Sequence, residues 1–229
     1  MGNKRSDWSR RTRLVALLSL CWLPRVQGAD LADLAAVTQL SRPAIYGETA
    51  NMPAGRGFDF TVVVVRNAGW QPDEIEAAIR ETAAIFLRRC GLPISVDRVL
   101  TVDLPDDYQE LDEAEEERLV GGLTERPAVL FVNATTENHN AYSYLESWPI
   151  SRAGTIWITR DAPTVCRGPL LAHEISHVAL DDPGHSDDLD NLMSHRCGHS
   201  NLTNQRINTE LSERQCARLK RRFCVDGAC

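Results

Sequence analysis

Strand-like and helix-like patterns of apolar residues alternate along most of this chain. Residues 58–65, FDFTVVVV, are largely apolar and β-branched, which is typical of a buried strand. A helix is predicted from Pro72, because acidic residues follow this proline and apolar positions then recur on one face until Gly91. Residues 94–102 alternate like a second strand. The order strand, helix, strand predicts a parallel pair with a right-handed crossover.

The second half of the chain has three shorter strand candidates and a strongly apolar helix. The strands are predicted over residues 128–132, 141–145 and 155–159. The helix begins at Gly168 and Pro169 and is apolar almost all round. A helix of this kind is expected to be buried inside a domain.

A final, amphipathic helix is predicted over residues 209–223. Its apolar positions, which should face the core, are Leu211, Leu219 and Phe223. Its outer face is basic and carries Arg218, Arg221 and Arg222. Together these elements predict an α+β fold: a twisted mixed sheet of about five strands with a crossover helix, a buried helix and a C-terminal helix.

The first 57 residues differ in character from the rest. Residues 1–28 place basic side chains before a short apolar run and a small-residue cleavage pattern, which predicts a secretory signal peptide. The segment SRR at residues 9–11 leaves a twin-arginine export route open, although Arg13 stands where an aromatic residue is usual. The apolar run is too short to span a bilayer, so we expect no stable membrane insertion after signal cleavage. Glycine and proline in residues 29–57 predict a poorly ordered leader or short pro-segment before one domain at residues 58–229.

Charge and cysteine content limit the partners and the compartment. The net charge is −7, and removal of the predicted signal, which has six basic side chains and one acidic one, brings it to −12. Nucleic acid is therefore not an expected partner, and we expect a monomer. An even number of cysteines remains, which predicts disulfides in an exported protein but does not fix their pairing. These cysteines are Cys90, Cys166, Cys197, Cys216, Cys224 and Cys229.

Residues 103–117 form an acidic segment, with nine acidic side chains among fifteen residues. Such a segment could bind calcium or select basic substrates. A solvated loop or an exposed helix is the better interpretation, because charged runs usually lie on solvated faces.

The most informative segment is HEISH, residues 173–177, within the apolar helix. Histidines four residues apart lie on one face, so His173 and His177 can converge on one cation. Buried histidines cost several kcal/mol unless they are satisfied, and a divalent cation satisfies both. Glu174 points about 100° round the helix, so it suits a general base better than a metal ligand. A catalytic zinc site has three protein ligands and one open position.

The third ligand must follow the end of this helix. Asp181-Asp182-Pro183-Gly184 is a strong helix stop, and His185 comes directly after it. We therefore predict His185 as the third zinc ligand. The alternatives left open by the sequence are Asp181, Asp182, His195 and His199.

With these residues the chain resembles a metzincin metallopeptidase, closest to the matrixin-like branch. That family's HExxHxxGxxH motif supplies three zinc histidines and a general base, and a methionine turn follows. His173, Glu174 and His177 match directly, and Met193 follows His185 at the usual distance. The chain departs from the motif because His185 comes eight positions after His177 instead of six, and Leu180 replaces the glycine. We interpret this as a two-residue insertion in which Gly184 takes over the turn.

The resemblance implies that residues 58–229 are a metallopeptidase-like catalytic domain of a secreted or periplasmic zinc endopeptidase. His173, His177 and His185 would hold Zn²⁺, and Glu174 would take a proton from water and pass it to the departing amine. A peptide or protein substrate would lie extended along an edge strand near Tyr142 and Tyr144.

Two other functions remain compatible with the sequence. One is a zinc hydrolase of non-protein amides such as cell-wall peptides. The other is a non-enzymatic secreted binding module in which zinc is structural. Glu174 argues against the binding module, because a purely structural site needs no base.

Overall fold

The computed structural model describes residues 38–40, 57–104, 110–137, 139–194 and 208–224. The predicted signal peptide at residues 1–28 lies outside the described residues, and so does most of the predicted leader. The alternative ligands His195 and His199 also lie outside them. Among the helices of the described part, none is long and apolar enough to cross a membrane.

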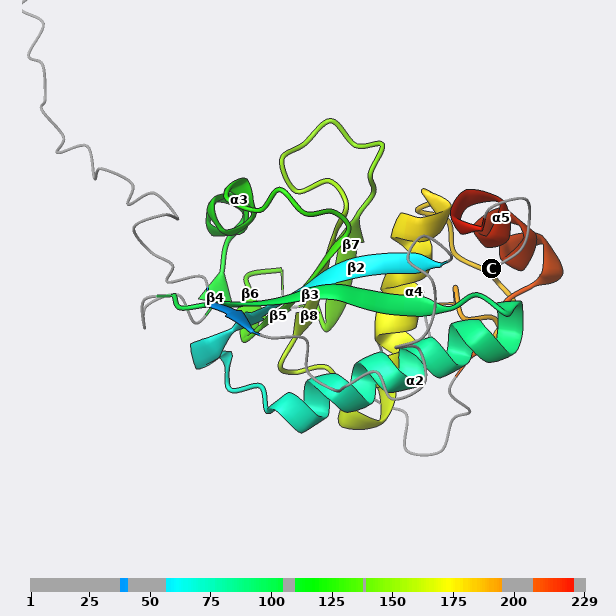
Figure 1. Cartoon of the computed structure of the whole chain (residues 1–229), viewed down its shortest axis with the longest axis horizontal. Helices are drawn as coiled ribbons and strands as arrows, with labels where there is room; N and C mark the ends of the chain where they lie inside the picture. The colour runs from blue at the N-terminus through cyan, green and yellow to red at the C-terminus, as the bar shows by residue number, and fades with distance from the viewer. Residues whose placement is uncertain (1–37, 41–56, 105–109, 138, 195–207, 225–229) are drawn as a thin grey trace, which may run out of the picture.

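A six-stranded mixed sheet is the centre of the fold (Figure 1). Its strands, in spatial order, are β1 (Thr38–Leu40), β3 (Ile94–Val102), β2 (Phe58–Val65), β5 (Ala128–Val132), β8 (Thr155–Thr159) and β7 (Ala141–Tyr144). Strands β3, β2, β5 and β8 are parallel, whereas β1 and β7 are antiparallel to their neighbours. The predicted α+β class, the mixed sheet and the parallel pairing of the first two predicted strands are therefore confirmed.

Three short strands were not predicted. Residues 38–40 of the predicted leader form β1, which pairs with β3. Strands β4 (Glu110–Leu111) and β6 (Ala134–Thr135) form a separate two-stranded parallel sheet. Strands of two or three residues are too short to carry a hydrophobic period.

Helix α2 (Pro72–Cys90) is the predicted crossover between β2 and β3. It begins at Pro72 with a capping box between Gln71 and Glu74, and it ends at Gly91, whose backbone is left-handed. Short 3-10 turns, η1 (Arg66–Ala68) and η2 (Thr164–Cys166), precede α2 and α4. Figure 1 shows α2 running along one side of the sheet, with α3 (Glu113–Gly121) on the other side.

Helix α4 (Arg167–Leu180) is buried at all of its positions, as its apolar sequence predicts. It packs against α2 and against β7 and β8. Gly168 permits the close approach of the two helices, because a Cβ atom there would lie 2.4 Å from the Glu81 carboxylate. The Thr82 hydroxyl donates a hydrogen bond to the Gly168 carbonyl (2.9 Å) at this crossing.

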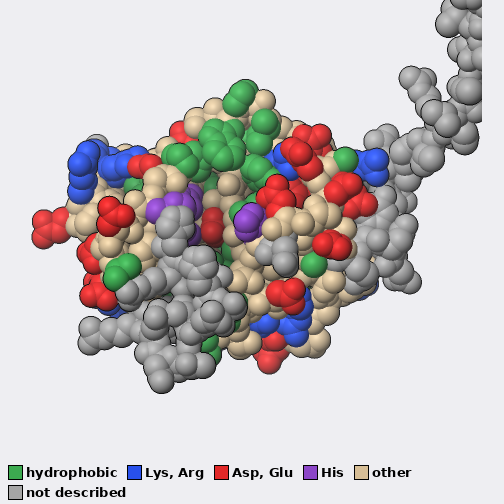
Figure 2. Space-filling model, turned by 180° about the vertical axis from the view of Figure 1, so that it is seen from behind, with side chains coloured by type: hydrophobic (Ala, Val, Ile, Leu, Met, Phe, Trp, Pro, Cys, Tyr) green, Lys and Arg blue, Asp and Glu red, His purple; other side chains and the backbone are tan. Residues whose placement is uncertain are grey.

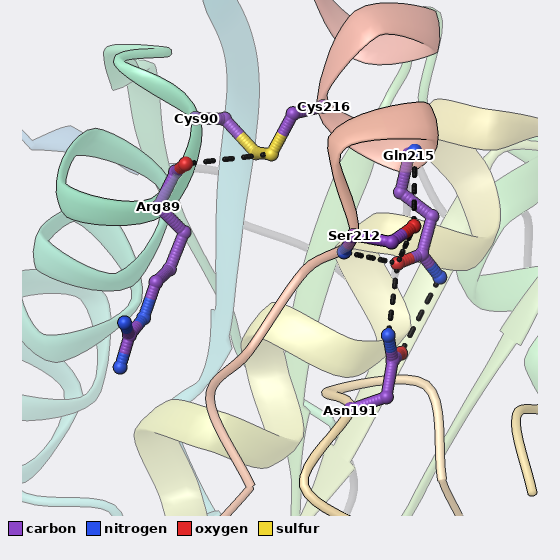
Figure 3. Close-up of a disulfide and its surroundings, with 6 residues drawn as sticks. All are labelled: Arg89, Cys90, Asn191, Ser212, Gln215 and Cys216. Carbon is purple, nitrogen blue, oxygen red and sulfur yellow. Dashed lines mark hydrogen bonds between the residues drawn. A yellow bond between two sulfur atoms is a disulfide. The ribbon is translucent and has the colours of Figure 1, made fainter. Parts of the chain in front are cut away.

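Helix α5 (Glu213–Phe223) begins four residues later than predicted, because Ser212 caps it and forms a capping box with Gln215. A disulfide between Cys90 and Cys216 joins it to the end of α2 (Figure 3). Cys224 is also disulfide-bonded. Cys166 is a buried free thiol, so the expectation drawn from an even number of cysteines does not hold for it.

The basic face of α5 does not simply point to solvent as predicted. The Arg218 guanidinium donates to the Leu180 carbonyl (2.7 Å), and Arg222 donates to the carbonyls of Val178 (3.3 Å) and Ala179 (3.0 Å). These carbonyls belong to the last turn of α4, and the Val178 carbonyl also accepts the Asp181 amide (3.1 Å). The arginines therefore cap the C-terminus of the buried helix.

Helix α3 begins within the acidic segment, and among its acidic side chains that of Glu116 is buried. Glu116 is 3% exposed, and its carboxylate accepts hydrogen bonds from Arg152 (2.9 Å), Tyr144 (3.0 Å) and Tyr142. The interpretation of residues 103–117 as wholly solvated was wrong at Glu116. Arg152 offsets the cost of burying this carboxylate.

Candidate metal centre

The middle of α4 carries three polar residues that the sequence analysis singled out. His173, Glu174 and His177 are 8%, 6% and 6% exposed, so three polar groups lie inside an apolar helix environment. After Leu180 the chain turns at Asp181, which adopts a left-handed backbone conformation with φ of 50°. The turn returns the chain toward α4 and brings His185 back beside the first two histidines.

The three predicted histidines converge. Their ligand atoms all lie within 4.8 Å of one another. The His177 Nε2 atom is 3.0 Å from Nε2 of His173 and 3.3 Å from Nε2 of His185. Two nitrogens bound to one tetrahedral zinc ion at about 2.0–2.1 Å lie about 3.3 Å apart. The spacing of these nitrogens therefore fits a common metal ion.

Backbone carbonyls fix the orientation of two of the rings. The Nδ1 atom of His173 lies 2.6 Å from the Leu192 carbonyl, and Nδ1 of His177 lies 2.7 Å from the Asp182 carbonyl. A carbonyl can only accept a hydrogen bond, so each Nδ1 carries the proton and each Nε2 keeps a lone pair. Two lone pairs 3.0 Å apart repel each other, and a cation between them removes that repulsion. The donor set is thus arranged for a cation.

Glu174 lies beside this cluster. Its Oε2 atom accepts a hydrogen bond from the Ser143 hydroxyl of β7 (2.7 Å). Burial raises the pKa of the Glu174 carboxyl, and His177 and the Ser143 hydrogen bond oppose this rise. Burial also lowers the pKa of His177, which favours the neutral ring that binds metals. Ser143 was not singled out from the sequence, because only the pairing of β7 brings it to α4.

A groove of about 490 Å³ contains the cluster and Glu174. It runs between α4 and β7, and Figure 2 shows histidine side chains around a hollow on this face, with hydrophobic side chains gathered along one side. Its walls include residues that the sequence did not indicate, namely His139, Asn140, Leu145, Trp148, Ser194 and Asn208. Five of these are polar or aromatic residues in loops, and no local pattern marks them.

The turn around Met193 lies beneath the site. Met193 is 2% exposed, and its amide donates to the Asn191 side chain (2.9 Å). The Asn208 amide donates to the Asn191 carbonyl (3.0 Å) and to the Ser194 hydroxyl (2.6 Å). These hydrogen bonds fix the turn that carries the Leu192 carbonyl, the acceptor for His173 Nδ1.

The two acidic alternatives for the third ligand are engaged elsewhere. The Asp181 carboxylate accepts the Ser147 amide (3.2 Å), and the Asp182 carboxylate pairs with Arg218 (2.8 Å). Neither belongs to the histidine cluster within the part of the chain that the structure describes.

Comparison with known proteins identifies no family for this chain. No protein-family model matches it, and no curated protein matches it. Two of the similar solved structures are metalloproteinase-II from Bacteroides fragilis (TM-score 0.49, 17% identity, 72% of this chain, 52% of that chain) and a chaperone-substrate complex (TM-score 0.45, 8% identity, 74% and 34%). The chain thus spans about half the length of the first. Similarity of this extent carries no argument about activity, which must come from the site.

Proposed function

We propose that this chain is an exported zinc-dependent endopeptidase of metzincin type, related to the matrixin-like branch. One observation carries the proposal: three imidazole nitrogens converge beside a buried carboxylate, Glu174, in a groove bordered by an edge strand. A purely structural metal site needs neither the carboxylate nor the groove.

In this proposal His173, His177 and His185 hold Zn²⁺. Their nitrogen spacing supports this assignment, as does the tautomer imposed on His173 and His177 by backbone carbonyls. Zinc bound by three histidines supplies Lewis acidity and lowers the pKa of water in its open position.

Glu174 is proposed as the general base. Its Oε2 atom accepts the Ser143 hydrogen bond, so we assign proton transfer to Oε1. Because burial raises its pKa, the carboxyl is able to hold a proton taken from water until the amine departs. The Ser143 hydroxyl fixes the carboxylate in the groove during both transfers.

Strand β7 is proposed as the substrate platform. It is the last strand of the sheet, and among the described strands none pairs with its outer side. An extended peptide can add to such an edge through main-chain hydrogen bonds. Leu145, Trp148 and Leu170 line the same groove and provide apolar surface for side chains of the peptide. Export is supported by the signal-like residues 1–28 and by the Cys90–Cys216 disulfide.

The test uses the full chain purified after export, with zinc measured by mass spectrometry and cleavage measured on a peptide library. We expect about one zinc per chain and cleavage that falls about 10²–10⁴-fold in Glu174→Gln, with zinc retained. Exposed Glu117→Gln serves as the matched control and should leave both unchanged.

Three outcomes would overturn the proposal. Cleavage of cell-wall peptides alone would make the enzyme an amide hydrolase of another class. Zinc binding with no cleavage of either substrate would indicate a binding module. Full activity in Glu174→Gln would remove the assigned base.

A further inference from the structure

Helix α5 carries no residue of the proposed metal site, but two of its side chains bind the loops next to that site. Gln215 and Arg218 are three residues apart and therefore share one face of the helix. Each contacts a loop whose backbone carbonyl orients one of the histidines.

Gln215 supports the turn before Met193 (Figure 3). Its Oε1 atom accepts from the Asn191 side-chain amide (3.0 Å), and its Nε2 atom donates to Asn191 Oδ1 (3.3 Å). The carbonyl of the next residue, Leu192, accepts a hydrogen bond from His173 Nδ1 (2.6 Å). The paired amides thus fix the residue next to this acceptor.

Arg218 supports the loop between α4 and His185. It pairs with the Asp182 carboxylate (2.8 Å) and donates to the Leu180 carbonyl (2.7 Å). The Asp182 carbonyl receives His177 Nδ1, and the Asp182 carboxylate accepts the amide of Gly184 (2.9 Å), which precedes His185. Arg218 therefore holds Asp182 in place. The Asp182 carbonyl orients His177, and the Asp182 carboxylate fixes the backbone just before His185.

The disulfide fixes α5 itself. Cys216 lies between Gln215 and Arg218 in the sequence and is bonded to Cys90 at the end of α2. Helix α2 in turn packs against α4, which carries two of the histidines. The disulfide therefore holds α5 in a fixed position relative to α4, through α2.

We propose that α5 is a positioning element of the metal centre, in which Gln215 and Arg218 hold the carbonyls that orient His173 and His177. This inference rests on the proposed zinc site. Loss of groups that orient metal ligands typically weakens metal binding about 10–100-fold. The same range is expected for Arg218→Ala, and a change near its lower end for Gln215→Ala.

Arg222→Ala is the matched control. Arg222 also caps carbonyls of α4, at Val178 and Ala179, and also forms an ion pair, with Glu146. It contacts neither Asp182 nor Asn191 among the described residues. Its removal should lower the stability of the protein to an extent similar to that of Arg218→Ala, but should leave zinc affinity unchanged.

Zinc affinity is measured by chelator competition on the full chain, and the Co²⁺ spectrum reports ligand geometry. We expect Arg218→Ala to weaken zinc binding and alter the Co²⁺ bands, and Arg218→Lys to recover part of the affinity through its charge on Asp182. Equal zinc affinities in Arg218→Ala and Arg222→Ala would overturn the inference.

A metal-free readout separates this inference from the proposed function. The ¹⁵N shifts of the His177 imidazole in chelator-treated protein report its tautomer, and Arg218→Ala should change them whereas Arg222→Ala should not. Absence of zinc binding in the unaltered protein would refute the proposed function, whereas an unchanged His177 tautomer in Arg218→Ala would refute the positioning role.

Discussion

Substitution of Glu116 by glutamine tests whether the buried ion pair on α3 stabilises the fold. Glutamine keeps the size of the side chain and removes its charge. The side chains of Glu116 and Arg152 are only 4% and 6% exposed, and both Tyr142 and Tyr144 donate to the Glu116 carboxylate. The Arg152 guanidinium also lies 4.4 Å from the centre of the Tyr144 ring. The variant would leave a buried cation beside two tyrosine hydroxyls.

The expected cost follows from what remains around Arg152. Removal of one partner from a buried ion pair costs about 3–5 kcal/mol, because the other charge stays buried. Arg152 keeps a second ion pair with Glu113, whose side chain is 75% exposed. This remaining partner reduces the expected loss in free energy of unfolding to about 2–4 kcal/mol. For a domain of this size the melting temperature should fall by about 5–15 °C.

Thermal and urea unfolding followed by circular dichroism measure this loss. Glu113→Gln is the control on the same arginine, and we expect about 0–1 kcal/mol because Glu113 is exposed to solvent. If Glu116→Gln and Glu113→Gln lower the melting temperature equally, the buried network does not stabilise the fold and the reasoning is refuted.

Two further predictions concern Glu74 and Ser143. Hydrogen bonds from Arg160, from the Gln71 backbone and from Arg167 lower the pKa of Glu74 to about 2. A lowered pKa stabilises the folded state above pH 4.5, the ordinary pKa, and this stabilisation disappears as the pH falls toward 2. Glu74→Gln should therefore lower the free energy of unfolding by about 1 kcal/mol at pH 7 and by progressively less below pH 4.5, as measured by urea titration. An equal loss at pH 3 and pH 7 would contradict this. Ser143→Ala should lower kcat about tenfold, or about 1.4 kcal/mol, with zinc content unchanged; an unaltered kcat would show that Ser143 does not position Glu174.

Strand β5 and helix α4 were predictable because their patterns are local. β5 is a continuous apolar run, and every one of its residues is buried. α4 is apolar on all faces and is buried throughout. The proposed ligands could also be named from the sequence, because the four-residue spacing of His173 and His177 fixes their relation on any helix.

The buried Glu116 could not be predicted, because its partners are distant in the sequence. Tyr142 and Arg152 lie 26 and 36 residues away in the sequence, and the tertiary fold brings them to it. The Cys90–Cys216 disulfide, with a sequence separation of 126, depends in the same way on the packing of α5. Contacts of this kind are consequences of the fold and carry no local signal.

The loop between His177 and His185 illustrates why motif spacing alone is an incomplete criterion. Leu180 stands at the position of the motif glycine, and the prediction that Gly184 takes over the turn was wrong, because Gly184 does not have a positive φ. The left-handed residue that reverses the chain is Asp181, one position after Leu180. Aspartate tolerates this conformation better than most residues, and its carboxylate is held by the Ser147 amide. The Ser186 amide then donates to the Met193 carbonyl (2.8 Å), which closes the loop on its far side.

The two additional residues are thus accommodated without moving the third imidazole away from the cluster. The Asp182 carboxylate, which accepts the Gly184 amide and pairs with Arg218 of α5, also holds this loop. At the proposed metal site, the affinity for metal should therefore depend on the contacts of α5 with this loop as well as on the spacing of the histidines.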